Sequence, residues 1–260
     1  MKIKQLLQNH KNKIITLATV LILFLVWELV ARILSLHLVL PTFSSVFLSF
    51  LKLFTQKTFY TSLSATLLRS VIGYIIGFVL GVILGVTAGK FSTLHAVIKP
   101  LAAAMRATPV AALAILLYIW LGSNILPPVI GVLLIFPIVY EQIRTATANI
   151  PEELEDVLRE MGSGFLHSAR TVYLPLVLPH TLSLISSTFG MNLKAVITAE
   201  VLASSMPSIG RQIYFANQNI IYEINTLFAW VLVAILISAV FEVLLKFICK
   251  KITQKISWMD

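Results

Sequence analysis

The sequence predicts an all-α fold, a polytopic membrane bundle of about six transmembrane helices with one short cytoplasmic helix. Of the 260 residues, 58% are hydrophobic and only 12% are charged, against roughly 25% charged in an ordinary soluble domain. One domain of this size cannot bury so many apolar side chains unless its outer surface also faces an apolar solvent. Each span needs about 20 apolar residues, so the chain has no room for a sizeable soluble domain.

Six apolar runs follow one another along the chain. They cover residues 14–34, 63–89, 96–121, 125–148, 172–203 and 227–248. They predict a transmembrane domain over 14–248, flanked by an N-terminal segment (1–13) and a C-terminal tail (249–260). Six spans put both termini on one side, and most Lys and Arg residues fall on that side, which marks it as cytoplasmic.

The second run carries a glycine at every fourth position. Residues four apart lie on nearly the same helix face, so the glycines form a groove where another helix can approach closely. They are Gly73, Gly77, Gly81, Gly85 and Gly89. We interpret this stripe as a helix-packing face. The stretch before it, residues 35–60, is amphipathic and is predicted to lie in the membrane interface.

No motif predicts a cofactor, metal or catalytic site in the chain itself. The nearest match to a phosphate-binding loop, residues 85–91, is one residue short of the Walker A spacing and lacks the Ser or Thr that would hold magnesium. The five histidines are scattered, and one cysteine, Cys249, excludes a disulfide within the chain. The basic residues lie between apolar runs, so the charge of +9 is a topology signal and does not point to nucleic acid.

The loop between the fourth and fifth runs, about residues 149–171, predicts a short cytoplasmic helix. Pro151 fits its first turn, the acidic residues that follow suit the positive end of the helix dipole, and Gly162 or Gly164 suits its end. Its apolar residues are spaced i, i+3, i+4, i+7 and form one stripe: Leu154, Val157, Leu158 and Met161. That stripe either rests on the chain's own membrane helices or inserts into a groove on another protein.

The same loop resembles the EAA loop of ABC importer permeases. That loop reads Glu-Ala-Ala, three residues, Gly, nine residues, Ile, one residue, Leu-Pro. Three residues of this chain match the pattern at full spacing: Gly162, Leu174 and Pro175. The others are replacements: Asp156 for Glu, Val157 and Leu158 for the two alanines, and Val172 for Ile. Further likeness runs from about residue 27 to 242, includes Met105-Arg106-Ala107-Thr108-Pro109, and is closest to the nitrate/sulfonate/taurine-type branch.

The resemblance implies a permease subunit in a bacterial plasma membrane, not an enzyme. Its expected partners are cytoplasmic ABC ATPase subunits that bind ATP and Mg, an extracytoplasmic substrate-binding protein, and a second, identical permease chain. The short helix then becomes a coupling helix, and ATPase docking is expected at Leu154, Asp156, Val157, Leu158, Met161, Gly162, Leu174 and Pro175.

The implied cargo is a small anion such as a sulfonate or nitrate, with a vitamin precursor as the alternative. Two other classes compete with this interpretation. A self-sufficient, ion-coupled secondary transporter often shows an inverted repeat with broken helices, and no such repeat is detected. A membrane-bound enzyme needs titratable groups clustered at one pocket, and the scattered histidines speak against it.

Ionisable residues within spans cost about 2.5 to 3.5 kcal/mol each on insertion scales, so each needs a partner, a wet cavity or a role. Glu28 and Arg32 are four residues apart and can neutralise each other. Arg106 either snorkels to the cytoplasmic interface or faces the pore. Lys194 and Glu200 are six apart, about 120° around the helix, and cannot pair directly. We hypothesise that Lys194 lines the translocation pathway and that Glu200 braces it; an inter-helix ion pair without substrate contact is the alternative.

Overall fold

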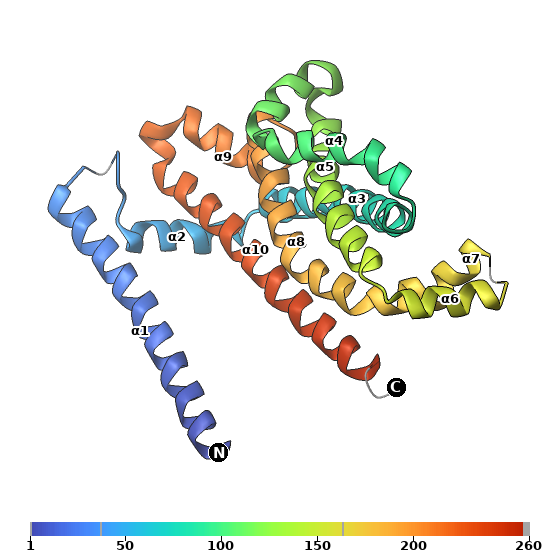
Figure 1. Ribbon diagram of the computed structural model, residues 1–260. Coiled ribbons are helices and arrows are strands. Elements are labelled where there is room, and N and C mark those ends of the chain that lie inside the picture. Colours follow the sequence, from blue (N-terminus) through green and yellow to red (C-terminus); the bar gives the residue numbers. More distant parts are fainter. Residues whose placement is uncertain (1, 37, 163, 257–260) are drawn as a thin grey trace. The chain divides into compact units, whose positions relative to one another are not determined.

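Helices account for most of the chain. The computed structural model describes residues 2–36, 38–162 and 164–256, and no strand occurs among them, which confirms the all-α prediction (Figure 1). In chain order the elements are α1 (Lys2–Leu34), α2 (Phe43–Leu53), α3 (Lys57–Lys90), α4 (Ser92–Ala107), α5 (Val110–Ala148), α6 (Glu152–Glu160), α7 (Phe165–Ser168), the π-helix η1 (Ala169–Tyr173), α8 (Leu174–Ala203), α9 (Ile209–Gln218) and α10 (Ile220–Ile256).

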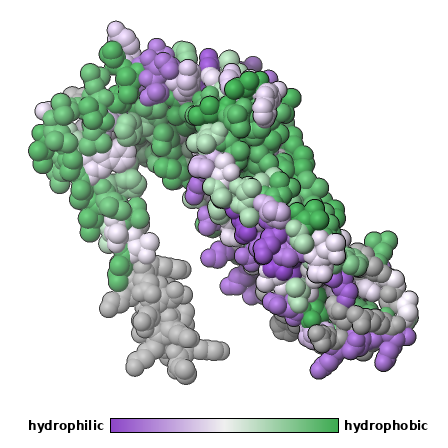
Figure 2. All heavy atoms as spheres, turned by 45° about the horizontal axis from the view of Figure 1, so that its top comes forward, coloured by the Kyte–Doolittle hydropathy of each residue, from purple (hydrophilic) through white to green (hydrophobic). Residues whose placement is uncertain are grey.

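The chain divides into two compact units. The first combines Met1–Lys57 with Phe215–Val233, and the second combines Thr58–Tyr214 with Ala234–Asp260. Among the described residues, three helices are long and apolar enough to cross a membrane: α3, α5 and the Ile220–Gln254 part of α10. Figure 2 shows hydrophobic side chains over much of the visible face, as expected of a surface that meets lipid.

The first unit ties α1 to α2 through polar and aromatic contacts. The predicted Glu28–Arg32 pair is confirmed at 2.7 Å, and the Glu28 carboxylate also accepts a hydrogen bond from the Ser44 amide at 3.0 Å. Trp27 Nε1 donates to the Pro41 carbonyl at 3.1 Å. The rings of Phe24 and Phe43 stack with their centroids 4.4 Å apart. These contacts fix the turn that leads into the amphipathic α2.

In the second unit, the glycines of α3 lie directly against α5. A Cβ atom at Gly81 would come within 2.7 Å of Val139 Cβ, and one at Gly85 within 2.8 Å of Ile143 Cβ. Gly73, Gly77 and Gly89 meet other residues of α5 in the same way: Pro128, Val132 and Thr147 respectively. Because α3 places no side chain at these five positions, α5 packs directly against its backbone along the whole stripe.

The predicted third span, residues 96–121, is not one continuous helix. Pro109 has no amide hydrogen and disfavours a helical residue before it, and Thr108 is extended (φ −83°, ψ 127°), so α4 ends at Ala107 and α5 begins at Val110. The boundary between the third and fourth predicted spans lies inside α5, at Gly122, where φ is 68°. The expectation of an unbroken third span is therefore wrong.

Helix α8 packs on α5 through small residues. Ala195, Ala199 and Ala203 form one buried cluster with Leu126 and Ile130 of α5. A larger cluster nearer the loop between α5 and α8 joins α3, α5, η1 and α8: Tyr74, Val86, Ile135, Val139, Ile143, Tyr173, Val177 and Phe189. We call this larger cluster the lower core. These contacts hold α3, α5 and α8 as one packed body, which positions the loop between α5 and α8.

Candidate functional site

The predicted cytoplasmic helix is present as α6. It begins directly after Pro151, whose carbonyl accepts a hydrogen bond from the Leu154 amide at 3.1 Å. It ends at Glu160, one residue before the expected Met161, and Gly162 follows with φ 64°. A Cβ atom at Gly162 would meet nothing within 4 Å, so the glycine serves the left-handed backbone conformation rather than close packing.

The apolar stripe of α6 is divided between two environments. Leu158 is partly buried and packs against the lower core. Leu154 and Met161 are 39% and 73% exposed, so they are available to a partner. Asp156 and Pro175 are also exposed, whereas the side chains of Val157 and Leu174 lie outside the part of the chain that the structure describes. One residue of the stripe thus rests on the chain's own helices, and docking of the exposed residues on another protein stays a prediction.

Sequence reasoning missed one exposed apolar residue beside this stripe. Leu166, in the one-turn helix α7, is 83% exposed. Figure 1 shows α6 and α7 together at one end of the second unit, beyond α5. Leu166 forms no periodic stripe with its neighbours in the sequence, so only its place beside α6 in the structure identifies it as a possible contact residue.

The chain returns from this loop into α8 through the five-residue π-helix η1. Pro175 follows within the first turn of α8 and has no amide hydrogen to donate to the preceding turn, which is a setting where a wider helical turn is tolerated. Tyr173, the last residue of η1, is buried in the lower core, and the Lys90 Nζ lies 5.9 Å from its ring centroid. The Leu-Pro part of the EAA pattern thus lies where the loop between α5 and α8 joins the packed bundle.

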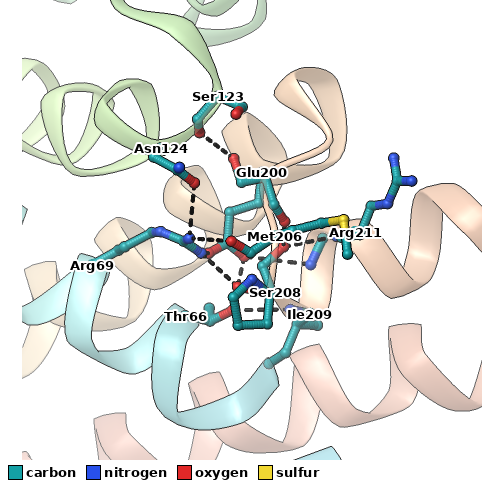
Figure 3. Close-up of polar contacts among 12 residues, drawn as sticks. Thr66, Arg69, Ser123, Asn124, Glu200, Met206, Ser208, Ile209 and Arg211 are labelled. Atoms are coloured by element: carbon teal, nitrogen blue, oxygen red, sulfur yellow. Dashed lines mark hydrogen bonds and ion pairs between the residues drawn. The ribbon is translucent and has the colours of Figure 1, made fainter. Parts of the chain in front are cut away.

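A buried polar cluster surrounds Glu200 of α8 (Figure 3). The carboxylate is fully buried; it accepts a hydrogen bond from Thr66 Oγ1 at 2.8 Å and forms an ion pair with Arg69 at 3.1 Å. The amide of Gly210 also donates to it at 3.3 Å. Glu200 therefore does not brace Lys194 within this chain, and it does not face a solvent route there. Its partner is Arg69, 131 residues earlier, which no local pattern could identify.

The Arg69 guanidinium connects Glu200 to three further groups. It donates to the carbonyls of Pro207 at 2.7 Å and Met206 at 3.2 Å, and to Asn124 Oδ1 at 3.3 Å. Ser205 Oγ donates to the Ser123 carbonyl next to these contacts. One arginine therefore joins α3, α8, the bend of α5 and the loop between α8 and α9. We call this group of residues the Arg69–Glu200 cluster.

Lys194 lies on the face of α8 that is not packed in this chain. From Ser183 onward, the exposed positions of α8 recur every three or four residues, which is one helical stripe. They are Ser183, Ser187, Met191, Lys194, Thr198 and Leu202. We call them the α8 stripe. A stripe with three hydroxyl groups and one ammonium group is more polar than a surface that faces lipid tails.

Arg106, the third predicted pathway residue, lies in the last turn of α4 and is exposed. It lines a cavity together with Thr108 and Ile130. Whether Arg106 faces a pore or snorkels to the interface stays a prediction. Among the described residues, no group of three His, Cys, Asp or Glu side chains is placed to hold a metal ion.

These features define a class of protein: a helical membrane subunit with a short helix that exposes apolar side chains at one end and a polar face on a packed helix. The family model for "Binding-protein-dependent transport system inner membrane component" matches residues 77–257, more than half of the chain. The chain belongs to this family. It is therefore a multi-pass membrane permease subunit of an ABC importer, not itself an enzyme, and it works with ATPase subunits and a substrate-binding protein.

Solved structures of two ABC importers share the fold. The chain is similar to the MetNI methionine ABC transporter in an inward-facing conformation, with a TM-score of 0.57 and 17% identity, over 76% of this chain and 93% of that one. It is also similar to a bacterial ABC transporter that imports the acidic polysaccharide alginate, with a TM-score of 0.63 and 16% identity, over 96% of this chain and 99% of that one. Among curated protein sequences, none matches this chain.

Proposed function

We propose that two copies of this chain form the translocation pathway of an importer for a small anion, of the nitrate/sulfonate/taurine-type branch. The α8 stripe carries this proposal. A lysine in a predicted span costs about 2.5 to 3.5 kcal/mol where it meets lipid, and such residues usually face a bundle interior or a water-filled cavity. Lys194 stands on the exposed stripe of a helix whose other faces are packed, and no ion pair with a described residue neutralises it.

The ammonium group of Lys194 on the α8 stripe favours anionic cargo. On the same stripe, the Ser187 and Thr198 hydroxyls donate to carbonyls of α8, and their oxygens can still accept hydrogen bonds from the water around an ion, whereas apolar side chains cannot. The structural neighbour that imports an acidic polysaccharide shows that this fold serves an anionic cargo elsewhere. Among nitrate, a sulfonate and a vitamin precursor, the chemistry of the stripe supports the two anions.

The ATPase would act on this chain through α6. In the proposed complex, ATP and Mg bind to the partner ATPase, and Leu154 and Met161 insert into a groove on it, while Leu158 holds α6 on the bundle. Transport then requires that the nucleotide states of the ATPase favour different states of the bundle. Both termini lie in the cytoplasm in this arrangement, in agreement with the distribution of Lys and Arg.

The role of Lys194 is tested by ATP-driven uptake in vesicles that contain the permease, its ATPase and its binding protein. Lys194→Met should lower the uptake of the anion at least about tenfold, because one charge at close range in a partly dry pathway contributes more than 1.4 kcal/mol. Lys246→Met removes an exposed charge from α10 and should leave uptake unchanged. Normal uptake by an intact Lys194→Met complex contradicts the proposed role.

A further inference from the structure

A cavity of about 310 Å³ lies where the third predicted span is broken. Its walls come from the end of α4, the start of α5, and the part of α5 that follows Gly122. Eight of its ten lining residues have apolar side chains, among them Val110, Leu113, Leu133 and Ile138. The other two are Arg106 and Thr108. The cavity thus has a hydrocarbon wall and one cationic side chain.

Arg106 is the charged group that the cavity offers. The Thr108 hydroxyl already donates to the Ala104 carbonyl at 2.8 Å. Glu141 of α5 is engaged by Arg144 at 2.8 Å. No ion pair with a described residue involves Arg106, so its guanidinium can donate two parallel hydrogen bonds to an anion.

The cavity lies at the break between α4 and α5. Residues 96–107 and 110–121 flank it within the predicted third span, and these two stretches have the same length. The break therefore lies near the middle of this apolar run of the sequence, and an arginine within such a run is costly unless it faces water or a ligand. Helices broken within a membrane are tolerated where they line a cavity, and transporters use such breaks to bind cargo.

The size and the walls of the cavity select among anions. A water molecule takes about 30 Å³ of liquid volume, so an inorganic anion of a few atoms fills only a small part of the cavity and leaves the apolar walls facing water. A short hydrocarbon chain behind the charged head covers these walls. Each buried methylene then raises affinity about fourfold until the cavity is full.

We propose that this cavity is a transit site for a small organic anion. The anionic head pairs with Arg106, and the hydrocarbon part lies against Val110, Leu113 and Leu133. This inference rests on the proposed function and narrows its cargo from anions in general to organic anions.

The charge preference of the cavity is tested by cysteine labelling in the complete complex. Leu113→Cys, in a Cys249→Ser background, is treated with two methanethiosulfonate reagents of similar size, one with a sulfonate and one with a trimethylammonium group. Each rate is divided by that reagent's rate with a free thiol. The sulfonate reagent should react at least about tenfold faster. Arg106→Gln should abolish the preference, Arg106→Lys should retain it, and the exposed Lys99→Gln on α4 should not change it.

The hydrocarbon wall is tested by protection in the same assay. Linear alkanesulfonates should slow labelling at concentrations that fall with each added methylene, whereas nitrate should protect only at far higher concentration. Three results would each overturn the inference. The first is equal normalised rates for the two reagents, and the second is no labelling in any nucleotide state. The third is equal protection by nitrate and by every alkanesulfonate. Uptake that still depends on Lys194 and α6 would then leave the proposed function standing. Uptake without the ATPase would reject the proposed function itself.

Discussion

Glu200 illustrates how one buried carboxylate fixes several segments of the chain. Its two oxygens are held by Arg69, Thr66 and the Gly210 amide. Thr66 Oγ1 also accepts a hydrogen bond from the Ile209 amide at 2.9 Å. A Cβ atom at Gly210 would lie 2.6 Å from the Val201 amide nitrogen, so the start of α9 can approach α8 only with a glycine here. Removing the carboxylate leaves the arginine, which is mostly buried, without its counter-ion.

We expect Glu200→Ala to destabilise the permease strongly. Breaking a buried ion pair from one side costs about 3 kcal/mol or more, because the remaining charge is left unpaired. Glu200→Gln keeps a hydrogen-bond acceptor for Thr66 and should cost less. The midpoint of thermal unfolding of the purified chain in detergent measures both effects.

The control for Glu200 is Glu28→Ala. It breaks the Glu28–Arg32 pair, in which the arginine side chain is largely exposed, and exposed pairs contribute little. Equal midpoints for Glu200→Ala and Glu28→Ala would show that the Arg69–Glu200 cluster does not hold the bundle together.

Sequence reasoning reached only part of this residue-scale picture. The cost of a carboxylate in a span predicted that Glu200 needs a partner, and the spacing of six excluded a direct pair with Lys194. The identity of the partner depends on how α3 and α8 pack, and this tertiary contact has no local signal. The Glu28–Arg32 pair could be predicted because both residues lie on one helix face.

At the scale of elements, the glycine stripe of α3 determines how closely α5 can pack. Gly81→Leu places a side chain where even a Cβ atom would come within 2.7 Å of Val139. Overpacking of this kind costs about 1 to 3 kcal/mol. We expect a lower thermal midpoint and less assembled complex on size-exclusion chromatography.

Gly164→Leu is the matched control for Gly81→Leu. A Cβ atom at Gly164 meets nothing within 4 Å, and its backbone is not in the left-handed region. Its thermal midpoint should remain within error of the original chain. A Gly81→Leu protein as stable as this control would contradict the packing role of the stripe.

The division of the α6 stripe predicts two distinct defects. Leu154→Ala with Met161→Ala removes exposed side chains, so folding should be normal while ATP hydrolysis becomes uncoupled from uptake. Leu158→Ala removes a contact with the lower core and should cost about 2 kcal/mol of stability. Uptake, ATP hydrolysis and the midpoint of thermal unfolding, measured on the same preparations, distinguish uncoupling from loss of stability. Coupled uptake by the Leu154/Met161 double variant would contradict docking through these residues.

The existence of most elements could be predicted from periodicity, but their breaks could not. The α6 helix follows from its stripe and from Gly162, and α3 from its apolar run. The break at Thr108–Pro109 was missed because the apolar run continues through it, although Pro109 is itself a breaker signal. The division of α6 into exposed and anchored residues depends on the lower core, which forms only when distant helices meet.

For the molecule as a whole, the α8 stripe predicts a contact between two copies of the chain. In a Cys249→Ser background, Met191→Cys or Thr198→Cys should form a covalent dimer when membranes are treated with a bifunctional thiol cross-linker long enough to reach across a water-filled pathway. Ile75→Cys lies on an exposed, apolar part of α3 and should remain monomeric under the same conditions. Non-reducing gel electrophoresis distinguishes them. Equal cross-linking at Ile75→Cys, or none at either α8 position, would contradict a dimer formed along this stripe.

The anchoring of α6 by Leu158 has a mechanical consequence. Leu158 touches the same closely packed cluster that contains Ile143 of α5 and Val177 of α8. Packed protein interiors have low compressibility and transmit strain. If α6 docks on the ATPase as proposed, a displacement of α6 is therefore transmitted directly to the adjoining ends of α5 and α8, and the stiffness of these few apolar contacts sets how much of the movement reaches the rest of the two helices.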